Sequence, residues 1–300
     1  MSAANGRVGA DAVAEVPSEV LDDVATVVGA EVTPLGRLPG GVNAGAVLVR
    51  LTGGTAAVLK VEGRSHALHL DSTLRAQRIV EHMRERGYPT PAWLGAGATP
   101  THVWHLMDFV DAAPAPHLTP SIVEQLMEIV EIQAGRASEP YDHWAYAWRV
   151  ATGREPAVAG LSDHSSVAAA LVERVHGRCA NVPPPPGAPD MVHADLNPSN
   201  VLVRDGAVVA VVDIENAGSG TRATDLTTLQ WHTFHESLDE VRSRLWTTIL
   251  ATVGSDGAAV LTATQVLLQL KWSIGLERDD LVAEVLERGR RALDELDALA

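Results

Sequence analysis

The stretch 192–215 constrains the fold of this chain more than any other part of the sequence. It begins with His193-Ala194-Asp195, reaches Asn200 five residues after that aspartate, and continues past Asp213. Between Asn200 and Asp213, the pair Asp205-Gly206 separates two valine-rich runs, which is typical of a β-hairpin with a two-residue turn. A hairpin returns the chain toward its starting point, so we expect Asn200 and Asp213 to lie close together.

The residue types in this stretch suit phosphoryl transfer from a nucleotide. That reaction needs a carboxylate that orients the attacking hydroxyl and accepts its proton, oxygen ligands for Mg²⁺, and a cation that gathers the phosphate oxygens. Asp195 suits the first role. Asn200 and Asp213 suit the second, because Mg²⁺ prefers hard oxygen donors. Lys60, near the end of an apolar strand predicted over 56–61, suits the third.

Lysine is rare in this chain, which makes Lys60 informative. Lys60 and Lys271 are the only lysines among 23 basic side chains, and the others are arginines. An ammonium group is a compact charge on a flexible stem, whereas a guanidinium group is a wide planar fork. We therefore expect the position of Lys60 to require a compact cation, and we expect Lys271 to lie on the surface.

The order of the predicted elements divides the chain near residue 110. The first part is rich in strands, with a turn signal over 52–55 and a helix predicted over 71–86. The second part is mostly helical, and capping boxes that open at Ser121 and Ser237 predict two helix starts. A run of strands followed by a run of helices indicates an α+β fold.

These motifs resemble the aminoglycoside phosphotransferase and choline kinase-like family, which shares the protein-kinase fold. The loop 193–200 is similar to the family's catalytic loop, and Asp213 is similar to its metal-binding aspartate. The strand 57–61 resembles the strand that carries the family's lysine, and 105–110 resembles its hinge. Asp225 stands in a segment where the family carries an aspartate that braces the catalytic loop.

The resemblance implies a protein-kinase-like bilobal fold of the α+β class. Its strand-rich N-terminal lobe, residues 1–110, would bind the nucleotide, and its helical C-terminal lobe, residues 111–300, would carry catalysis and the substrate site. The implied cofactors are ATP and Mg²⁺, with Asp195 as the catalytic residue and Asn200 and Asp213 as metal ligands. The implied nucleotide-binding residues are Lys60, Gly40, Gly41, Met107, Asp108, Phe109 and Val110.

Two departures from the family pattern concern regulation and the nucleotide lysine. Ala194 replaces the arginine that regulated protein kinases carry beside the catalytic aspartate, and no Ala-Pro-Glu element follows, which suits a small-molecule kinase. The family usually pairs its strand lysine with a glutamate on the following helix, but here that position falls on Ala76 or Gln77. Either Gln77 holds Lys60 through a neutral hydrogen bond, or another carboxylate does.

Composition and missing motifs exclude several function classes. The formal net charge of −15 argues against a nucleic-acid binder, which normally presents a basic face. A single cysteine, Cys179, excludes a disulfide framework. Neither lysine follows a glycine, which excludes a Walker A loop, and Gly95-Ala96-Gly97 lacks the third glycine of a dinucleotide-binding fold. No apolar run could span a bilayer and no signal pattern is present, so we expect a cytoplasmic protein without a membrane partner.

The sequence favours an ATP-dependent O-phosphotransferase that acts on a hydroxyl of a small molecule. Residues after 110 hold 27 of the 38 acidic and 14 of the 23 basic side chains, a net charge of −13 that would concentrate a cationic acceptor. Within the resembled family this favours a basic antibiotic, either an aminoglycoside or a cationic peptide, and a role in resistance. The alternatives are a metabolic kinase for choline, a sugar or an amino alcohol, and a nucleotide-binding pseudokinase. The oligomeric state stays open.

Overall fold

The computed structural model describes residues 16–38 and 45–299. They form two compact units, one with the chain up to Pro116 and Ser199–Ala217, the other with His117–Pro198 and the chain from Gly218 onward. The strand-rich part lies in the first unit and the long helices lie in the second, so the predicted α+β class is confirmed. The division differs from the boundary predicted near residue 110, because the chain returns to the first unit over Ser199–Ala217.

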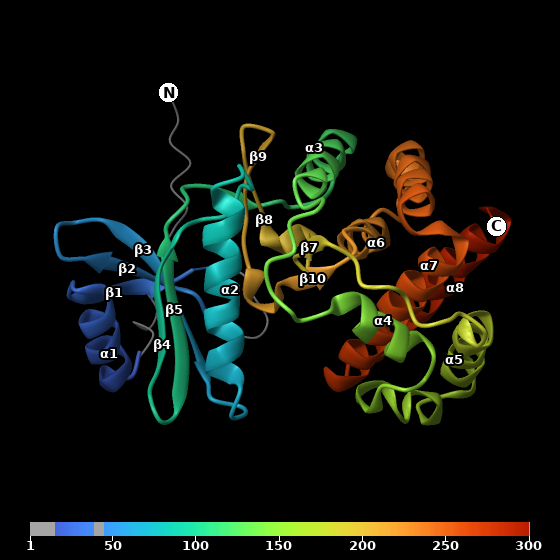
Figure 1. Ribbon diagram of the computed structural model, residues 1–300, viewed down its shortest axis with the longest axis horizontal. Coiled ribbons are helices and arrows are strands. Elements are labelled where there is room, and N and C mark those ends of the chain that lie inside the picture. The colour runs from blue at the N-terminus through green and yellow to red at the C-terminus, as the bar shows by residue number, and fades with distance from the viewer. Residues whose placement is uncertain (1–15, 39–44, 300) are drawn as a thin grey trace. The chain divides into compact units, whose positions relative to one another are not determined.

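The first unit is built on a five-stranded antiparallel sheet in the order β1-β2-β3-β5-β4 (Figure 1). The strands are β1 (Val32–Arg37), β2 (Val47–Leu51), β3 (Ala56–Gly63), β4 (Trp93–Ala98) and β5 (His102–Asp108). The predicted turn between β2 and β3 is present, and Gly53 and Gly54 take the positive φ angles, 101° and 93°, that glycine tolerates. Strand β3 pairs with β5, which brings segments far apart in the sequence side by side.

Helices α1 (Ser18–Val28) and α2 (His69–Arg84) cover opposite faces of this sheet (Figure 1). Successive residues of a strand point to opposite faces. The side chains that pack with α1 form one buried apolar cluster: Val20, Val24, Val47, Val49, Ala57, Leu59, Trp104 and Leu106. Lys60 and His105 alternate with these residues, so they lie on the other face, where they are register partners on β3 and β5.

Two glycines of β4 make room for helix α1. A Cβ atom at Gly97 would lie 2.7 Å from Cζ2 of Trp104, and one at Gly95 would lie 3.0 Å from Cγ2 of Val28. The indole N–H of Trp104 donates to Oδ2 of Asp23 on α1 at 2.7 Å. The Gly-Ala-Gly pattern therefore serves the packing of α1 against the sheet.

A smaller sheet of the first unit carries the predicted hairpin. Its strand order is β6-β8-β9, formed by Ala113–Pro114, Val201–Arg204 and Ala207–Val211. Asp205 and Gly206 have φ angles of 52° and 80°, the left-handed values that the tight hairpin turn requires. The predicted hairpin is confirmed, and its register pairs Val201 with Val211.

The second unit is mainly helical. Its helices are α3 (Pro120–Glu131), α4 (His143–Ala151), α5 (Ser166–Cys179), α6 (Ala223–Trp231), α7 (Asp239–Gly275) and α8 (Asp279–Leu299). Helix α7 bends at Gly254, where φ is 69° and ψ is 178°. The short strands β7 (Asp190–Val192) and β10 (Gly218–Gly220) pair antiparallel. Among the described residues, no helix combines the length and the apolarity needed to cross a bilayer.

Both helix starts predicted from capping boxes are wrong. Helix α3 begins at Pro120, and the side chain of Thr119 caps it by accepting a backbone N–H at 3.3 Å. Proline is favoured at the first helical position because it lacks an amide and its φ is already helical, so the start lies ahead of Ser121. Near Ser237 the chain forms a short 3₁₀ turn, and α7 begins at Asp239.

Candidate active site

The ammonium group of Lys60 contacts two carboxylates of the first unit. Its Nζ donates to Oε1 of Glu215 at 2.7 Å and forms an ion pair with Asp213. Lys60 stands on β3, while both carboxylates come from the end of β9 and the 3₁₀ turn η4 (Ile214–Asn216) that follows. The three side chains are between 12% and 34% exposed, so water screens their mutual attraction only in part.

Lys60 is held by a residue outside helix α2, where the family usually places a glutamate. Gln77 donates its side-chain N–H to Glu81 of its own helix at 3.3 Å, and the Lys60 ammonium contacts Glu215 and Asp213 instead. The alternative in which Gln77 holds the lysine is therefore wrong. A carboxylate holds it instead, and Glu215 supplies that carboxylate from the turn after β9. This role of Glu215 was not predicted from the sequence.

His105 completes the cluster from the neighbouring strand. It is the register partner of Lys60, and its Nε2 lies 3.3 Å from Oε1 of Glu215. The imidazole stacks on Trp93 of β4, with the ring centroids 4.0 Å apart and the planes within 6° of parallel. Burial lowers the pKa of His105 to about 4. The negative charge of Glu215 raises this pKa by a smaller amount, and the positive charge of Lys60 lowers it further. His105 is therefore neutral near pH 7.

Glu215 is ionised in this environment. Burial acts to raise the pKa of its carboxyl group, because a buried charge loses hydration. The charge interactions with His105 and Lys60, together with the hydrogen bond from Lys60, outweigh burial and hold that pKa below its ordinary value. The cluster thus combines a lysine cation, the Glu215 anion and a neutral imidazole at neutral pH.

The hairpin brings the two predicted metal ligands to one end of β8 and β9. Val201 pairs with Val211, and beyond this pair the N–H of Val212 donates to the C=O of Asn200 at 2.9 Å. Asp213 follows directly, with a left-handed φ of 67° that turns the chain out of the strand. The Asn200 side chain is buried, and both residues carry hard oxygen donors.

The loop that carries Asp195, in the second unit, is held by a buried carboxylate of α6. Asp225 accepts the backbone N–H groups of His193 at 2.7 Å and of Ala194 at 2.8 Å. It also accepts the side-chain amide of Gln133 at 2.9 Å. Ala194 has a φ of 69°, which non-glycine residues seldom adopt, so these bonds hold a strained backbone next to Asp195.

Asp195 is oriented by neighbours within its own loop. Its Oδ1 accepts from Nδ2 of Asn197 at 2.8 Å, and its backbone N–H donates to Nδ1 of His193 at 3.3 Å. His193 is fully buried. The imidazole therefore supports the loop from inside.

The segment predicted as the hinge follows the end of β5. Met107 is buried, and the N–H of Asp108 donates to the C=O of Ala92 at 2.9 Å. The amide of Asp108 is thus engaged within the protein, and the two residues after it are half-buried. The predicted nucleotide-binding glycines, Gly40 and Gly41, lie outside the described residues.

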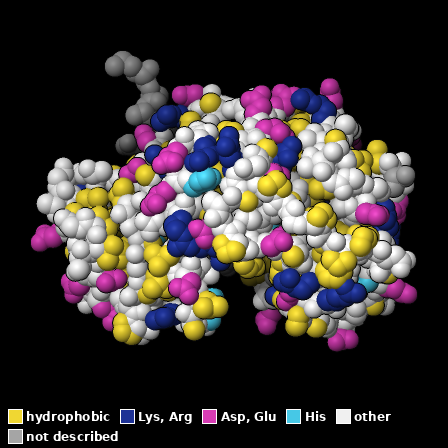
Figure 2. Space-filling model, in the orientation of Figure 1, with side chains coloured by type: hydrophobic (Ala, Val, Ile, Leu, Met, Phe, Trp, Pro, Cys, Tyr) yellow, Lys and Arg dark blue, Asp and Glu magenta, His cyan; other side chains and the backbone are white. Residues whose placement is uncertain are grey.

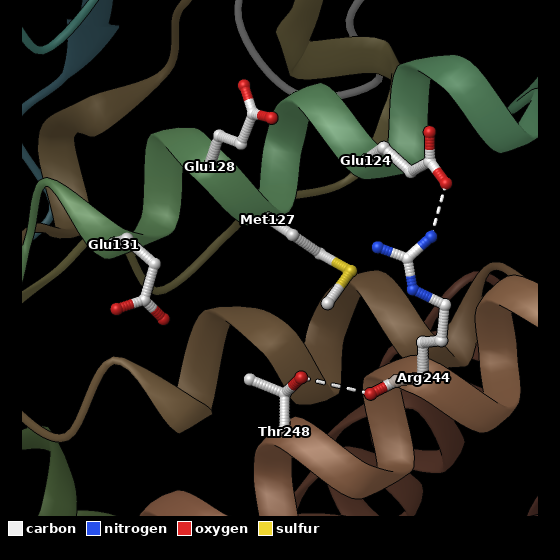
Figure 3. Close-up of a pocket in the computed structure, with 6 residues that line it drawn as sticks. All are labelled: Glu124, Met127, Glu128, Glu131, Arg244 and Thr248. Atoms are coloured by element: carbon white, nitrogen blue, oxygen red, sulfur yellow. Dashed lines mark hydrogen bonds and ion pairs between the residues drawn. The ribbon is translucent and has the colours of Figure 1, made fainter.

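A surface pocket of about 320 Å³ lies between α3 and α7 of the second unit (Figure 3). Its lining residues are Glu124, Met127, Glu128, Glu131, Arg244 and Thr248. Arg244 forms an ion pair with Glu124, and Arg222 forms one with Glu131 at 3.2 Å. Two of the three carboxylates are therefore compensated, and the pocket contains none of the predicted site residues.

Acidic and basic side chains are interspersed over the face of the molecule in Figure 2. In the second unit, Arg174 bridges Asp294 at 2.8 Å and Asp297 at 2.7 Å. Arg242 likewise lies 3.1 Å from Glu295. Several carboxylates of this unit therefore already have arginine partners on its helices.

A comparison with protein families covers most of the chain. Residues 35–258 match the family described as "Phosphotransferase enzyme family". The chain belongs to this family. The matched range includes Lys60, Asp195 and Asp213, and the predicted resemblance and enzyme class are confirmed. The protein is therefore a phosphotransferase.

Solved structures share the fold of this phosphotransferase at low sequence identity. A thermostable mutant of aminoglycoside phosphotransferase APH(4)-Ia, in a ternary complex with ADP and hygromycin B, is 16% identical with a TM-score of 0.70, covering 92% of this chain and 98% of that chain. A candidate fructosamine-3-kinase from Haemophilus somnus 129PT is 13% identical, with a TM-score of 0.62 over 91% and 96%. Amicoumacin kinase hAmiN is 12% identical, with a TM-score of 0.59 over 94% and 97%. No curated protein matches the sequence of this phosphotransferase.

The sequence did not assign Glu215 or His105 to the lysine cluster of this phosphotransferase, and His105 stood at the start of the predicted hinge, 105–110. Glu215 carried a usable signal, because it follows Asp213 by two residues in a short turn. His105 carried a weaker one, since a polar residue within the apolar run of β5 has to find a partner. The distances that join them to Lys60 come only from the sheet register and the hairpin.

Proposed function

We propose that this phosphotransferase transfers the γ-phosphoryl group of ATP to a hydroxyl of a cationic small molecule. Asp195 orients that hydroxyl and accepts its proton as the new bond to phosphorus forms. Lys60 gathers oxygens of the nucleotide phosphates. The backbone of the hinge, residues 107–110, binds the adenine.

Asn200 and Asp213 suit a magnesium site in this proposal. Their oxygens are hard donors, and Mg²⁺ needs few protein ligands because it keeps waters and phosphate oxygens. The backbone bond between Val212 and Asn200 holds the two ligands at one end of the hairpin. The ion pair of Asp213 with Lys60 supports the fit, since that carboxylate already faces a cation. When bound, Mg²⁺ would neutralise charge on the phosphates.

The observation that carries the proposal is the contact of Lys60 with Asp213 and Glu215. A phosphate-binding cation and a metal-binding carboxylate have to lie close together to act on one triphosphate. Here they are in direct contact, although 155 residues separate Lys60 from Glu215. A purely structural ion pair is the alternative reading of such a cluster. Membership of a phosphotransferase family favours the functional reading.

A cationic antibiotic is the acceptor class that we favour. The net charge of −13 after residue 110 would raise the local concentration of a cation. One similar structure holds ADP and hygromycin B in an aminoglycoside phosphotransferase, and another is an amicoumacin kinase with AMP-PNP and Ca²⁺. Phosphorylation of such a compound would make the protein a resistance enzyme.

A metabolic kinase for a sugar or an amino alcohol is the second candidate. The fold is also shared with the candidate fructosamine-3-kinase, over 91% of this chain. The ion pairs of Arg174 and Arg242 favour this candidate, because the carboxylates in these pairs already have cationic partners and do not bind a cationic acceptor directly. The acceptor would then be recognised mainly by hydrogen bonds to its hydroxyl groups.

Incubation with ATP, Mg²⁺ and a panel of hydroxyl compounds tests both candidates. The panel comprises hygromycin B, other aminoglycosides, cationic peptides, a fructosamine and choline. We expect mass spectrometry to find one added phosphoryl group on a cationic antibiotic, and expression of the protein to protect cells against that compound. Product formed only from the fructosamine or choline would replace the first candidate by the second. ATP binding without product from any acceptor would contradict both.

A further inference from the structure

We propose that Glu215 is the positioning residue that holds Lys60 for the nucleotide, in place of the helix glutamate that this chain lacks. His105 holds Glu215 in turn. The inference rests on the proposed function, because it concerns how the phosphate-binding lysine is oriented. It moves the anchor of Lys60 from helix α2 to the turn that also carries Asp213.

The carboxylates that pair with Lys60, Asp213 and Glu215, lie outside helix α2 and strand β3. Ala76 is fully buried, and Gln77 is bonded within its own helix. Glu62 stands on β3, but it lies on the exposed end of the strand, 3.4 Å from the imidazole of His69. Glu215, in contrast, accepts the ammonium of Lys60 at 2.7 Å.

Asp213 is a poor permanent partner for Lys60 if it also binds a metal. Its carboxylate would be shared with Mg²⁺, and the two cations would repel each other at short range. Glu215 keeps a separate negative charge beside Lys60 in that state. Because Asp213 and Glu215 lie two residues apart, the lysine and the metal carboxylate keep a spacing that does not depend on α2.

His105 gives Glu215 a second contact on the same oxygen. Its Nε2 lies 3.3 Å from the Oε1 atom that accepts Lys60. A neutral imidazole packs against this oxygen without placing another positive charge beside the lysine. Stacking on Trp93 fixes the plane of the ring. The carboxylate is thus held between side chains of two paired strands, β3 and β5.

The two lysines of the chain allow a direct test in the nucleotide-free protein. Labelling with ¹⁵N-lysine gives separate ammonium signals for Lys60 and Lys271, and the variant Lys271→Arg assigns them. We expect Glu215→Gln to shift the Lys60 signal and to speed its proton exchange, because a charged hydrogen bond is weakened. The matched variant Glu62→Gln, on the strand of Lys60, should change neither. His105→Gln should shift the Lys60 signal in the same direction as Glu215→Gln.

Nucleotide binding separates positioning from metal ligation. Calorimetry measures the Kd for ATP in the wild type, Glu215→Gln, Lys60→Met and the double variant, with Mg²⁺ and with EDTA. We expect Glu215→Gln to raise Kd about tenfold in both buffers, the size of one charged hydrogen bond, and to have no further effect in Lys60→Met. Glu215→Asp keeps the charge and should recover part of the affinity. Thermal unfolding confirms that each variant is folded.

Four outcomes would overturn the proposal. An unchanged Lys60 signal in Glu215→Gln would show that Glu215 does not contact the lysine. An unchanged signal in His105→Gln would show that His105 does not help to hold Glu215. If Glu215→Gln raised the Kd for ATP only in the buffer with Mg²⁺, Glu215 would be a metal ligand. If it raised the Kd by the same factor in the Lys60→Met background, Glu215 would act without the lysine. Failure of the proposed function is distinct, since the wild type would then bind no ATP while the NMR comparison still decides how Lys60 is held.

Discussion

At the scale of single residues, this protein uses a lysine where a wider cation has little room. Lys60 brings one compact ammonium within contact of Asp213 and Glu215. A guanidinium group spreads its charge over a planar fork and has to be accommodated across its whole width. The chain otherwise relies on arginine, so the choice of lysine at this position reflects the geometry of the cluster.

Lys60→Arg should therefore fail to replace the lysine. We expect kcat/KM for ATP to fall about 10²-fold or more, the usual loss when a donor to developing charge is misplaced. Steady-state kinetics over a range of ATP concentrations measures the loss. Lys271→Arg, the same change at an exposed lysine, is the matched control and should keep wild-type kinetics. Full activity of Lys60→Arg would show that any cation suffices.

His105 links the stability of the fold to pH. Its pKa is about 4 in the folded protein against an ordinary value of 6.5, so the unfolded chain binds more protons between these values. His105 alone should then contribute about 3 kcal/mol to the fall in the free energy of unfolding as the pH drops from about 6.5 to about 4. Urea unfolding at a series of pH values measures this loss.

The variant His105→Gln isolates the contribution of this imidazole. It should lose less of its free energy of unfolding over the same pH interval, whatever its stability at pH 7. His232 remains in the variant and contributes with the same sign, because burial lowers its pKa to about 4 as well. Identical pH dependence in the wild type and His105→Gln would show that His105 is not buried neutral.

At the scale of elements, short segments of each unit are fixed by side chains from other elements. The loop after β7 depends on Asp225 of α6, which holds two successive backbone N–H groups. Strand β4 depends on glycines that let Trp104 and helix α1 approach. Each arrangement can be tested by a small change at one position.

Asp225→Asn should loosen the loop that carries Asp195. An amide can accept one of the two N–H groups but presents its own donor to the other, so we expect a loss of about 2–3 kcal/mol in the free energy of unfolding. We also expect kcat to fall more than the affinity for ATP. Asp205→Asn, the same change at an exposed turn, is the control. Wild-type kcat in Asp225→Asn would contradict the bracing role.

Gly97→Ala should destabilise the first unit. The added Cβ would lie 2.7 Å from Cζ2 and 2.9 Å from Cε2 of Trp104, closer than van der Waals contact allows. Overpacking of this kind costs about 1–3 kcal/mol, which urea unfolding would detect. Gly63→Ala is the matched control, because no heavy atom lies within 4 Å of that Cβ position. Equal stability of the two variants would mean that Trp104 can move aside.

At the scale of the whole molecule, the sequence predicted the features that depend on neighbouring residues. The Asp205-Gly206 turn and the order of strands and helices are local patterns, and the structure confirms both. The helix start predicted at Ser121 is wrong because the neighbouring Pro120 takes the first helical position. The return of the chain to the first unit over Ser199–Ala217 depends on long-range packing, which no local pattern encodes.

The composition of the lysine cluster is a property of the tertiary structure. Lys60, His105 and Glu215 come from β3, β5 and η4, and only the sheet register and the hairpin bring them together. Sequence motifs identified Lys60 as a nucleotide-binding candidate, but they left its partner open between Gln77 and an unnamed carboxylate. For the same reason, a motif search underestimates how many residues orient the groups that it finds.

We propose above all that Asp195 is the catalytic carboxylate of this phosphotransferase. The most direct measurement is the turnover of Asp195→Ala with ATP, Mg²⁺ and an acceptor that the wild type phosphorylates, together with its Kd for ATP. We predict that kcat falls about 10²–10⁴-fold, the usual contribution of a general base, while the Kd for ATP and the unfolding midpoint stay close to those of the wild type. Near-normal kcat in folded Asp195→Ala would contradict the claim.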